Sequence, residues 1–399
     1  MLYKLLSPKK STTISIGILL CLIILGEMAK VFLGNGAGLK KQQVSGINLF
    51  IVFVSLQIIF APLQAGLSDF YCRKKSIIFC LVCITISTCV SSLYNYRPDL
   101  LILAALLFGI AGNLVSISRA GLLDLIFPHQ HFRFYIGLST VAIALGYCFS
   151  AILFRILPIF VILLLVILGL MAGIFIAHFY FIDIKDTQPF RHREKFSLSR
   201  EVYSLWNDLL SKPLFLLIFL TYFFLEVAFY EMFFDYTAMS ADSFLFSVVV
   251  MSLGYIMGAF IIKTHNLTDE TWLKIGFFCS FITLILFISI PIDRLLFLRL
   301  TFFVLFSLGY GLSIPCLFSL LSKQEASHSQ GRIYGLIDSF DASALLISYL
   351  VNGSFTTNPL PSKSTFIRFE NYVIPILPIT CFFVAMLIYN YYLIYRKKR

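Results

Sequence analysis

Long apolar runs separated by short polar segments constrain this chain more than any other feature of its sequence. A helix that crosses a membrane needs about 20 apolar residues, and the 399 residues contain runs of that length almost from end to end. In lipid the backbone must satisfy its own hydrogen bonds, so such runs form helices. The chain has 59% hydrophobic residues and a mean hydropathy of +0.91, which excludes a water-soluble globular protein. The sequence therefore predicts an all-α polytopic membrane protein with about twelve transmembrane helices. The predicted spans are residues 12–33, 45–65, 76–93, 100–123, 134–154, 157–180, 213–235, 244–263, 272–291, 295–321, 333–352 and 371–394.

Positive charges are distributed unevenly between these runs. Most of the 31 Lys and Arg residues fall before the first span, in residues 73–75, in the central polar segment or in the C-terminal tail. Short loops rich in Lys and Arg stay in the cytoplasm, so both termini are predicted to be cytoplasmic and the protein to lie in the cytoplasmic (inner) membrane. Anionic lipid headgroups then account for the net charge of +11, and no nucleic-acid partner is expected.

A polar interruption at residues 182–212 divides the chain near its middle. From Ser199 onward it is predicted to form a short amphipathic helix that lies on the membrane surface. We therefore expect an N-terminal six-helix bundle over residues 1–181, a cytoplasmic linker over 182–212, and a C-terminal six-helix bundle over 213–399.

The two halves show a weak internal repeat. The stretch LLFGIAGNLVS from Leu106 aligns with VLFSLGYGLSI from Val304, and RFYIGL from Arg133 aligns with RIYGL from Arg332. A repeat of half the chain length indicates a duplicated six-helix unit, as in transporters built from two parallel halves.

Charged side chains inside the predicted spans also follow a pattern. The central stretches of the third, sixth, ninth and twelfth spans carry none. A charge in hydrocarbon is costly, so the charged residues in the other spans should face a water-filled cavity or one another. These residues are Glu27, Lys30, Arg119, Glu226, Glu231, Arg299, Asp338 and Asp341.

The segment GLSDFYCRKK, residues 66–75, forms a polar bend between the second and third spans. Gly66 is expected to permit a tight turn, and the basic triplet places the bend at the cytoplasmic edge. The segment resembles the loop between the second and third helices of the major facilitator superfamily, with Gly66, Asp69, Arg73 and Lys74 at matching positions. Two positions depart from the family pattern, at Phe70 and Cys72. A basic loop that only sets topology is the alternative interpretation.

The resemblance implies a fold of two pseudo-symmetric six-helix bundles. In that family the first, fourth, seventh and tenth helices line a central cavity, and every third helix packs outside. The loop is understood to latch the two halves in one state, with its Asp accepting hydrogen bonds from a neighbouring helix end. Nothing in the sequence resembles a phosphate-binding loop, so neither ATP nor another cofactor is expected, and no metal-ligand pattern is present.

Glu27 is the first candidate for proton coupling, because a carboxyl in a medium of low dielectric can load and release a proton near neutral pH. It resembles the membrane-embedded acid in the first helix of proton-driven exporters of the superfamily. A structural ion pair with Lys30, one turn later, is the alternative. Glu226 lies about half a chain length later and is the predicted pseudo-symmetric partner of Glu27 across the cavity.

Arg119 is expected to pair with a carboxylate, because an isolated Arg in the membrane is costly. Asp338 and Asp341 are the candidates at a similar depth, and such a salt bridge would hold an inner gate shut. Alternatively, Arg119 reaches a lipid phosphate and Asp338 caps its helix. The aromatic residues Tyr222, Phe224, Tyr230 and Tyr310 are further candidates to line a cavity that binds amphipathic solutes.

These features predict a monomeric secondary transporter that moves a small organic solute by alternating access, with protons as the coupling ion and export as the direction. Acids outnumber bases among the charged residues of the spans, which favours a proton, a cationic solute or a zwitterion as cargo. Ala105 and the absence of Pro near Gly146 depart from the patterns of multidrug antiporters. An uptake permease for an amino acid or sugar is the alternative. A membrane enzyme such as an acyl transferase, built on Asp124, His129 and His131, or a receptor, fits less well.

Overall fold

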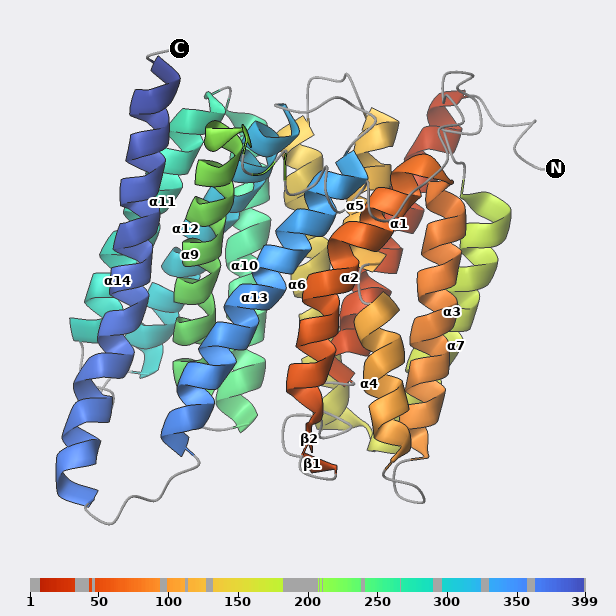
Figure 1. Cartoon of the computed structure of the whole chain (residues 1–399), viewed down its shortest axis with the longest axis horizontal. Coiled ribbons are helices and arrows are strands. Elements are labelled where there is room, and N and C mark those ends of the chain that lie inside the picture. Colours follow the sequence, from red (N-terminus) through yellow and green to blue (C-terminus); the bar gives the residue numbers. More distant parts are fainter. Residues whose placement is uncertain are drawn as a thin grey trace. The chain divides into compact units, whose positions relative to one another are not determined.

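The computed structural model describes most of the chain (Figure 1). The described residues are 8–32, 43–44, 47–93, 99–111, 114–126, 132–181, 207, 209, 211–237, 241–265, 267–289, 296–323, 330–356 and 363–397. In these ranges the chain is helical almost throughout, apart from one short hairpin. The amphipathic helix predicted from Ser199 falls almost wholly outside the described residues.

The helices follow the predicted spans in order. They are α1 (Pro8–Val31), α2 (Leu49–Phe70), α3 (Arg73–Ser92), α4 (Leu100–Ala111), α5 (Leu114–Ile126), α6 (Phe132–Ile156), α7 (Ile159–Tyr180), α9 (Pro213–Thr237), α10 (Ala241–Thr264), α11 (Asp269–Ser289), α12 (Leu296–Ser322), α13 (Gln330–Thr356) and α14 (Lys363–Lys397). The pair α4 and α5 occupies one predicted span. Among the described residues, 10 helices are long and apolar enough to cross a membrane, with Leu100–Ile126 counted once. The prediction of an all-α polytopic membrane protein is confirmed.

Burial differs between the helices as the charge pattern predicts. In an 18-residue apolar stretch of α7, α14 and α3, only 22%, 33% and 39% is buried inside the protein, the lowest shares among the ten membrane-length helices, whereas in α12 the buried share is 83%. The three helices with the lowest burial occupy the sixth, twelfth and third predicted spans. Their apolar surface is therefore available to lipid, and α12 lies in the protein interior.

The chain divides into two compact units, which we describe separately. The first unit contains Met1–Asn207 and Ser322–Ser339, and the second contains Asp208–Leu321 and Phe340–Arg399. The boundary passes through α13, whose first turns pack with the N-terminal helices. A division at residues 182–212 alone would place all of α13 in the C-terminal half.

In the first unit, α1 packs against α5, α6 and α7, while α4 packs between α2 and α3. An apolar cluster of Ile23, Val115 and Ala142 joins α1, α5 and α6. The hydroxyl of Ser87 on α3 donates to the carbonyl oxygen of Ala104 on α4 at 2.7 Å. These contacts make the N-terminal helices a single packed bundle.

A short hairpin precedes α2 and was not expected from the sequence. Its strands are β1 (Gln43–Val44) and β2 (Ile47–Asn48), paired antiparallel. The side chain of Asn48 then caps α2 by accepting hydrogen bonds from the backbone amides of Phe50 and Ile51 at 3.1 and 3.4 Å. The helix therefore begins at Leu49, four residues later than the predicted span.

The bend between α2 and α3 is shorter than the sequence indicates. Helix α2 continues through Asp69 to Phe70, and the chain turns only at Tyr71 and Cys72 before Arg73 begins α3. Gly66 is helical, so it does not make the tight turn that we expected of it. As a result, Asp69 and Arg73 project from the ends of two helices.

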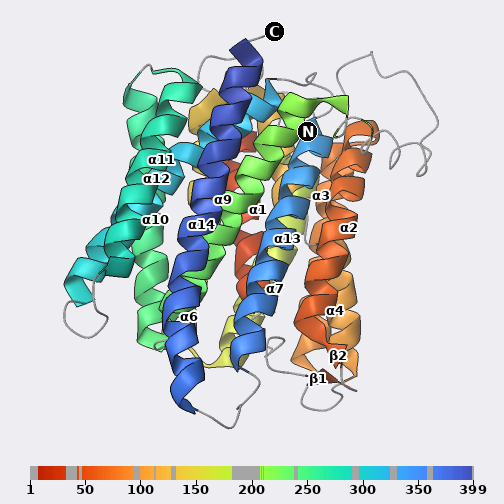
Figure 2. The same ribbon diagram turned by 60° about the vertical axis from the view of Figure 1, so that its left-hand side comes forward.

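In the second unit, α9 and α14 lie side by side along much of their length, as both views show (Figures 1 and 2). Helix α12 is packed closely on two sides. A Cβ added at Gly309 would lie 2.7 Å from the carbonyl oxygen of Gly276 on α11, and one at Gly311 would lie 3.0 Å from Cα of Tyr255 on α10. Glycines thus bring α12 into backbone contact with both neighbours.

Candidate functional site

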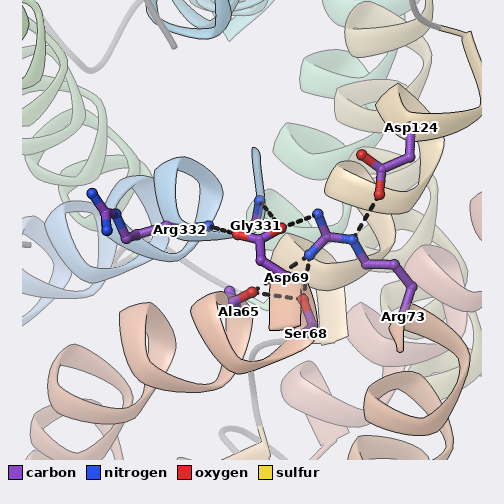
Figure 3. A network of polar contacts seen from close by, with 7 residues as sticks. All are labelled: Ala65, Ser68, Asp69, Arg73, Asp124, Gly331 and Arg332. Atoms are coloured by element: carbon purple, nitrogen blue, oxygen red, sulfur yellow. Dashed lines mark hydrogen bonds and ion pairs between the residues drawn. The ribbon is translucent and has the colours of Figure 1, made fainter. Parts of the chain in front are cut away.

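The end of α2 and the start of α13 meet at Asp69 in the first unit (Figure 3). The two carboxylate oxygens of Asp69 accept hydrogen bonds from the backbone amides of Gly331, at 3.1 Å, and Arg332, at 2.9 Å. The first amides of a helix have no partner within the helix and carry a partial positive charge. Asp69 therefore caps α13, which is the arrangement that the resemblance implied for this residue.

Arg73 holds this carboxylate in place from the start of α3. Its side chain is 1% exposed, and it forms ion pairs with Asp69 and with Asp124 at the end of α5, the latter at 2.9 Å. The same guanidinium donates to the hydroxyl of Ser68 and, at 3.5 Å, to the carbonyl oxygen of Ala65 (Figure 3). Two carboxylates thus share one guanidinium, and the positive end of α13 offsets part of the remaining negative charge.

Asp124 is a member of this network that sequence reasoning assigned elsewhere. We grouped it with His129 and His131 in the enzyme alternative, whereas its carboxylate accepts from Arg73. The two histidines lie outside the described residues. The signal available in the sequence for a partner of Arg73 was an acid at the end of a predicted span, at the depth of the basic triplet 73–75.

A stripe of small residues lets α13 approach α2 beyond the Asp69 cap. A Cβ at Gly335 would lie 2.6 Å from the carbonyl oxygen of Ala61, and one at Gly331 would collide with the carbonyl oxygen of Ala65. One turn further on, the hydroxyl of Ser339 donates to the carbonyl oxygen of Ile58 at 2.7 Å. We call this contact, formed by Gly331, Gly335 and Ser339 on α13 with Ile58, Ala61, Ala65 and Asp69 on α2, the α2–α13 latch.

Replacing Gly331 with Ala is expected to open the α2–α13 latch. The added methyl group collides with a backbone carbonyl that cannot rotate away, and overpacking of this kind costs about 1–3 kcal/mol. The measurement is thermal unfolding of the purified protein, together with the accessibility to maleimide of a cysteine introduced at Ser339.

Gly66→Ala is the matched control, because nothing lies within 4 Å of a Cβ at this helical position. It should leave the labelling unchanged and raise the unfolding temperature slightly, since Ala favours a helix over Gly by about 0.5–1 kcal/mol. Equal labelling of the Gly331→Ala variant and the parent protein would contradict close packing at this position.

Glu27 lies deep inside the first unit, where its side chain is 4% exposed. Gly146 on α6 packs directly against it, since a Cβ at Gly146 would lie 2.8 Å from both Cβ of Glu27 and the carbonyl oxygen of Ile24. Lys30 is half-buried on the same helix. The close approach of α6 fixes the backbone that carries Glu27, and the choice between proton coupling and an ion pair with Lys30 stays a prediction.

Arg119 and Asp338 both reach the interior of the first unit next to α5. Arg119 is 6% exposed and donates from Nε to the hydroxyl of Ser139 at 3.1 Å, while Asp338 is 7% exposed and accepts from the hydroxyl of Ser116. Ser116 and Arg119 are three residues apart and share one face of α5. The structure therefore places Asp338 about one helical turn from Arg119, and their pairing as a gate stays a prediction.

Asp341 has a different partner. It is half-buried in the second unit, and its Oδ1 accepts a hydrogen bond from the hydroxyl of Tyr230 on α9 at 2.7 Å. This contact separates the role of Asp341 from that of Asp338, although the sequence offered both as partners for Arg119.

A charge exchange between Arg119 and Asp338 is expected to restore function that either single change removes. Arg119→Asp or Asp338→Arg alone leaves a buried charge unpaired, which costs about 3–5 kcal/mol. Transport and thermal unfolding are measured for both single variants and the double variant. Exchange with Asp341 instead of Asp338 is the control and should restore nothing. Purely additive losses in the Arg119–Asp338 double variant would argue against the pair.

Glu226 occupies the interior of the second unit with 4% exposure. Its carboxylate accepts a hydrogen bond from the hydroxyl of Tyr310 on α12. Phe229, one turn along α9, has its ring centroid 4.7 Å from that of Tyr310, and Tyr255 on α10 has its centroid 5.5 Å from the same ring. Residues of three helices thus form one buried cluster, in which Tyr310 connects the carboxyl of Glu226 to the rings of Phe229 and Tyr255. We call Glu226, Phe229, Tyr255 and Tyr310 the Glu226 cage.

The other candidates lie outside these clusters. Lys74 is half-buried on the first turn of α3, next to Arg73. Tyr222 packs its ring against Phe318 at 5.2 Å between centroids, and the ring of Phe224 packs against Phe223 at 5.3 Å. Glu231 is 1% exposed, so it lies in the protein interior. The side chain of Arg299 lies outside the described residues.

The solved structures that are similar to this chain include transporters. The crystal structure of the human organic anion transporter MFSD10 (TETRAN) is similar with a TM-score of 0.71 and 15% sequence identity, over 97% of this chain and 100% of that chain. The transporter FucP in its outward conformation is similar with a TM-score of 0.68 and 14% identity, over 96% of this chain and 99% of that chain. A variant of the E. coli fucose:proton symporter FucP is similar with a TM-score of 0.66 and 15% identity, over 96% and 99% of the two chains. At such low identity these similarities establish the fold.

Comparison by sequence gives the family. No curated protein has a significantly similar sequence. The family model described as the Major Facilitator Superfamily, however, matches residues 12–349, which is most of the chain and covers both the α2–α13 latch and the Glu226 cage. Sequence, fold and the capped helix end at Asp69 therefore agree, and this chain belongs to the major facilitator superfamily.

Proposed function

We propose that this secondary transporter uses protons to drive a small organic solute out of the cell by alternating access. The observation that supports proton coupling is the pair of buried carboxyls, Glu27 in α1 and Glu226 in α9, each 4% exposed. These helices occupy the first and seventh predicted spans, which are equivalent positions in a duplicated six-helix arrangement.

Alternating access gives such carboxyls a coupling function. A carboxyl that is closed off from water is stable only when it is neutral or paired, whereas one that faces water is readily ionised. If each access state exposes the carboxyl to a different side of the membrane, it takes up a proton on one side and releases it on the other. Transport of the solute is thereby linked to the proton gradient.

The α2–α13 latch supplies the second part of the cycle. Opening it removes both backbone amides from Asp69 and leaves a buried carboxylate that shares Arg73 with Asp124. Breaking contacts to a buried charge costs several kcal/mol. The latch therefore stabilises one state of the transporter until solute or proton binding supplies a compensating free energy.

The proposal includes the placement of the chain in the cell. Both termini are cytoplasmic in the cytoplasmic (inner) membrane, since the basic residues 73–75 follow the α2–α13 latch and mark the inner face. Residues 1–181 and 213–399 form the two halves, residues 182–212 link them, and the transporter works as a monomer.

The test begins with a thermal-shift screen of the purified protein against metabolites, amino acids, siderophores and drugs, because a ligand that binds only the folded state raises the unfolding temperature. The ligand found is then measured in proteoliposomes across an imposed pH gradient. We expect solute flux in the direction opposite to proton flux, and no stimulation when the gradient is collapsed with an ionophore. Flux that is unaffected by the gradient would exclude proton coupling.

Uptake of a metabolite with protons is the second candidate. A variant of the E. coli fucose:proton symporter has a similar fold, and a symporter moves its solute and protons in the same direction. The same liposome assay separates the two, since a symporter accumulates solute on the side that protons enter. An antiporter that exports the solute accumulates it on the side that protons leave.

A further inference from the structure

We infer that the Glu226 cage binds the positively charged group of the transported solute, and that this solute is an amphipathic organic cation. The inference rests on the proposed function, because it names the solute of that transporter. It is carried by three observations on the second unit: the hydrogen bond from Tyr310 to Glu226, the aromatic rings that pack against Tyr310, and the signs of the buried charges.

Tyr310 is positioned by its two neighbours in the chain. Gly309 faces α11 at a distance that excludes a Cβ, and Gly311 faces α10 at a distance that leaves a Cβ very little room. Successive residues of a helix point about 100° apart, so the side chain between these glycines is directed away from both contacts and toward α9. Its hydroxyl accordingly reaches Glu226. The segment Gly309–Tyr310–Gly311 therefore fixes one wall of the cage.

The rings present the chemistry that cations bind. Phe229 and Tyr310 lie at 31° to each other with centroids 4.7 Å apart, and Tyr255 is tilted by 49° against Tyr310 at 5.5 Å. The face of an aromatic ring attracts an ammonium or similar cation within about 6 Å, most strongly where water is excluded. Phe229, Tyr255 and Tyr310 are all buried, which provides that exclusion, and Glu226 adds a full negative charge.

The buried charges of the second unit have one sign. Where the structure describes side chains in this unit, the charged residues that are buried are Glu226, Glu231 and Asp269, all acidic. The described basic residues there, Lys212, Lys263, Lys274 and Arg396, are exposed or half-buried. An anionic solute would meet acids in this interior, whereas a cation gains from both the carboxylate and the rings.

A matched pair of probes tests the inference on the full-length protein in detergent. Tetraphenylphosphonium and tetraphenylborate have nearly the same size and shape but opposite charge. We expect saturable binding of radiolabelled tetraphenylphosphonium that unlabelled tetraphenylborate does not displace. Glu226→Gln should weaken the binding about 10-fold or more, since a buried charge contact is lost. Tyr255→Leu should weaken it roughly 2- to 30-fold through loss of the ring face, and Tyr255→Phe should restore most of it.

Phe277→Leu is the control for loss of a buried ring elsewhere in the second unit, where Phe277 packs against Phe382 and Tyr389. This variant should bind like the parent protein. Binding of both probes alike, or losses that are equal for Phe277→Leu and Tyr255→Leu, would overturn the inference. The inference is also overturned if no tetraphenylphosphonium binds while proton-driven flux of another solute is measured. The proposed function stands in that case. Binding with the expected pattern but without proton-driven flux would instead keep the cage and overturn the proposed function.

Discussion

Replacement of Glu27 with Gln is expected to reduce proton-driven flux to the background of protein-free liposomes. Gln has nearly the same volume as Glu, so the close packing of α6 at Gly146 is preserved, but it cannot exchange a proton. The measurement is internal pH, followed with a trapped indicator dye, during solute transport in proteoliposomes. Solute exchange without a pH gradient should survive in this variant, because the substitution removes the coupling group and leaves the pathway intact.

Glu270→Gln provides the control for this experiment. Its side chain is 37% exposed and pairs with Arg396, whose side chain is 50% exposed, at the surface of the second unit, and surface ion pairs contribute only about 0–1 kcal/mol. We expect normal proton-driven flux in this control. Unchanged proton-driven flux in Glu27→Gln would exclude Glu27 as the coupling group and would favour its interpretation as a structural ion pair with Lys30.

Replacement of Arg73 with Ala is expected to cause one of the largest losses of stability among single substitutions in the first unit. The variant leaves Asp69 and Asp124 facing each other without the guanidinium that separates them. Removing one partner of a buried ion pair costs about 3–5 kcal/mol. Thermal unfolding in detergent should shift to lower temperature, and the α2–α13 latch should become accessible to maleimide at a cysteine introduced at Ser339.

Lys75→Ala is the matched control, two residues further along α3, where the side chain is exposed. A surface substitution of this kind changes stability by at most about 0.5 kcal/mol. Arg73→Lys adds a second comparison, because Lys keeps the charge but loses the planar fork that contacts two carboxylates at once. We expect the unfolding temperature of Arg73→Lys to lie between those of the parent protein and Arg73→Ala. If Arg73→Ala unfolded like Lys75→Ala, the network would not stabilise the fold.

The buried charged clusters of the two units differ in sign and in the groups that contact the charge. In the first unit a buried base, Arg73, is surrounded by carboxylates and backbone groups, which fits a structural lock that must hold until it is released. In the second unit a buried acid, Glu226, is hydrogen-bonded to Tyr310, whose ring packs against Phe229, and this is the cluster for which we infer cation binding. Arg73→Ala should therefore lower the unfolding temperature and open the α2–α13 latch, whereas Glu226→Gln should weaken solute binding and, because Glu226 is one of the two proposed coupling carboxyls, reduce proton-driven flux.

The sequence by itself determined the membrane helices and their order. Hydrophobic run length is a local property, so the predicted spans lie close to helices α1 to α7 and α9 to α14, with α4 and α5 together in one span. The segment 66–75 and the pattern of charged residues indicated the family. Burial of Glu27, Arg119 and Glu226 also followed from the sequence. A charged side chain inside an apolar run is costly in lipid, so it faces the protein interior.

Only the tertiary structure decided which side chains meet. The partner of Arg73 on α5, Asp124, is 51 residues away, and the amides that Asp69 caps are 262 and 263 residues away. No periodicity or composition encodes such pairings, since they depend on which faces of separate helices pack together. The glycines on either side of Tyr310 show the same principle: their spacing is visible in the sequence, but only the packing of α10 and α11 against α12 turns that tyrosine toward Glu226.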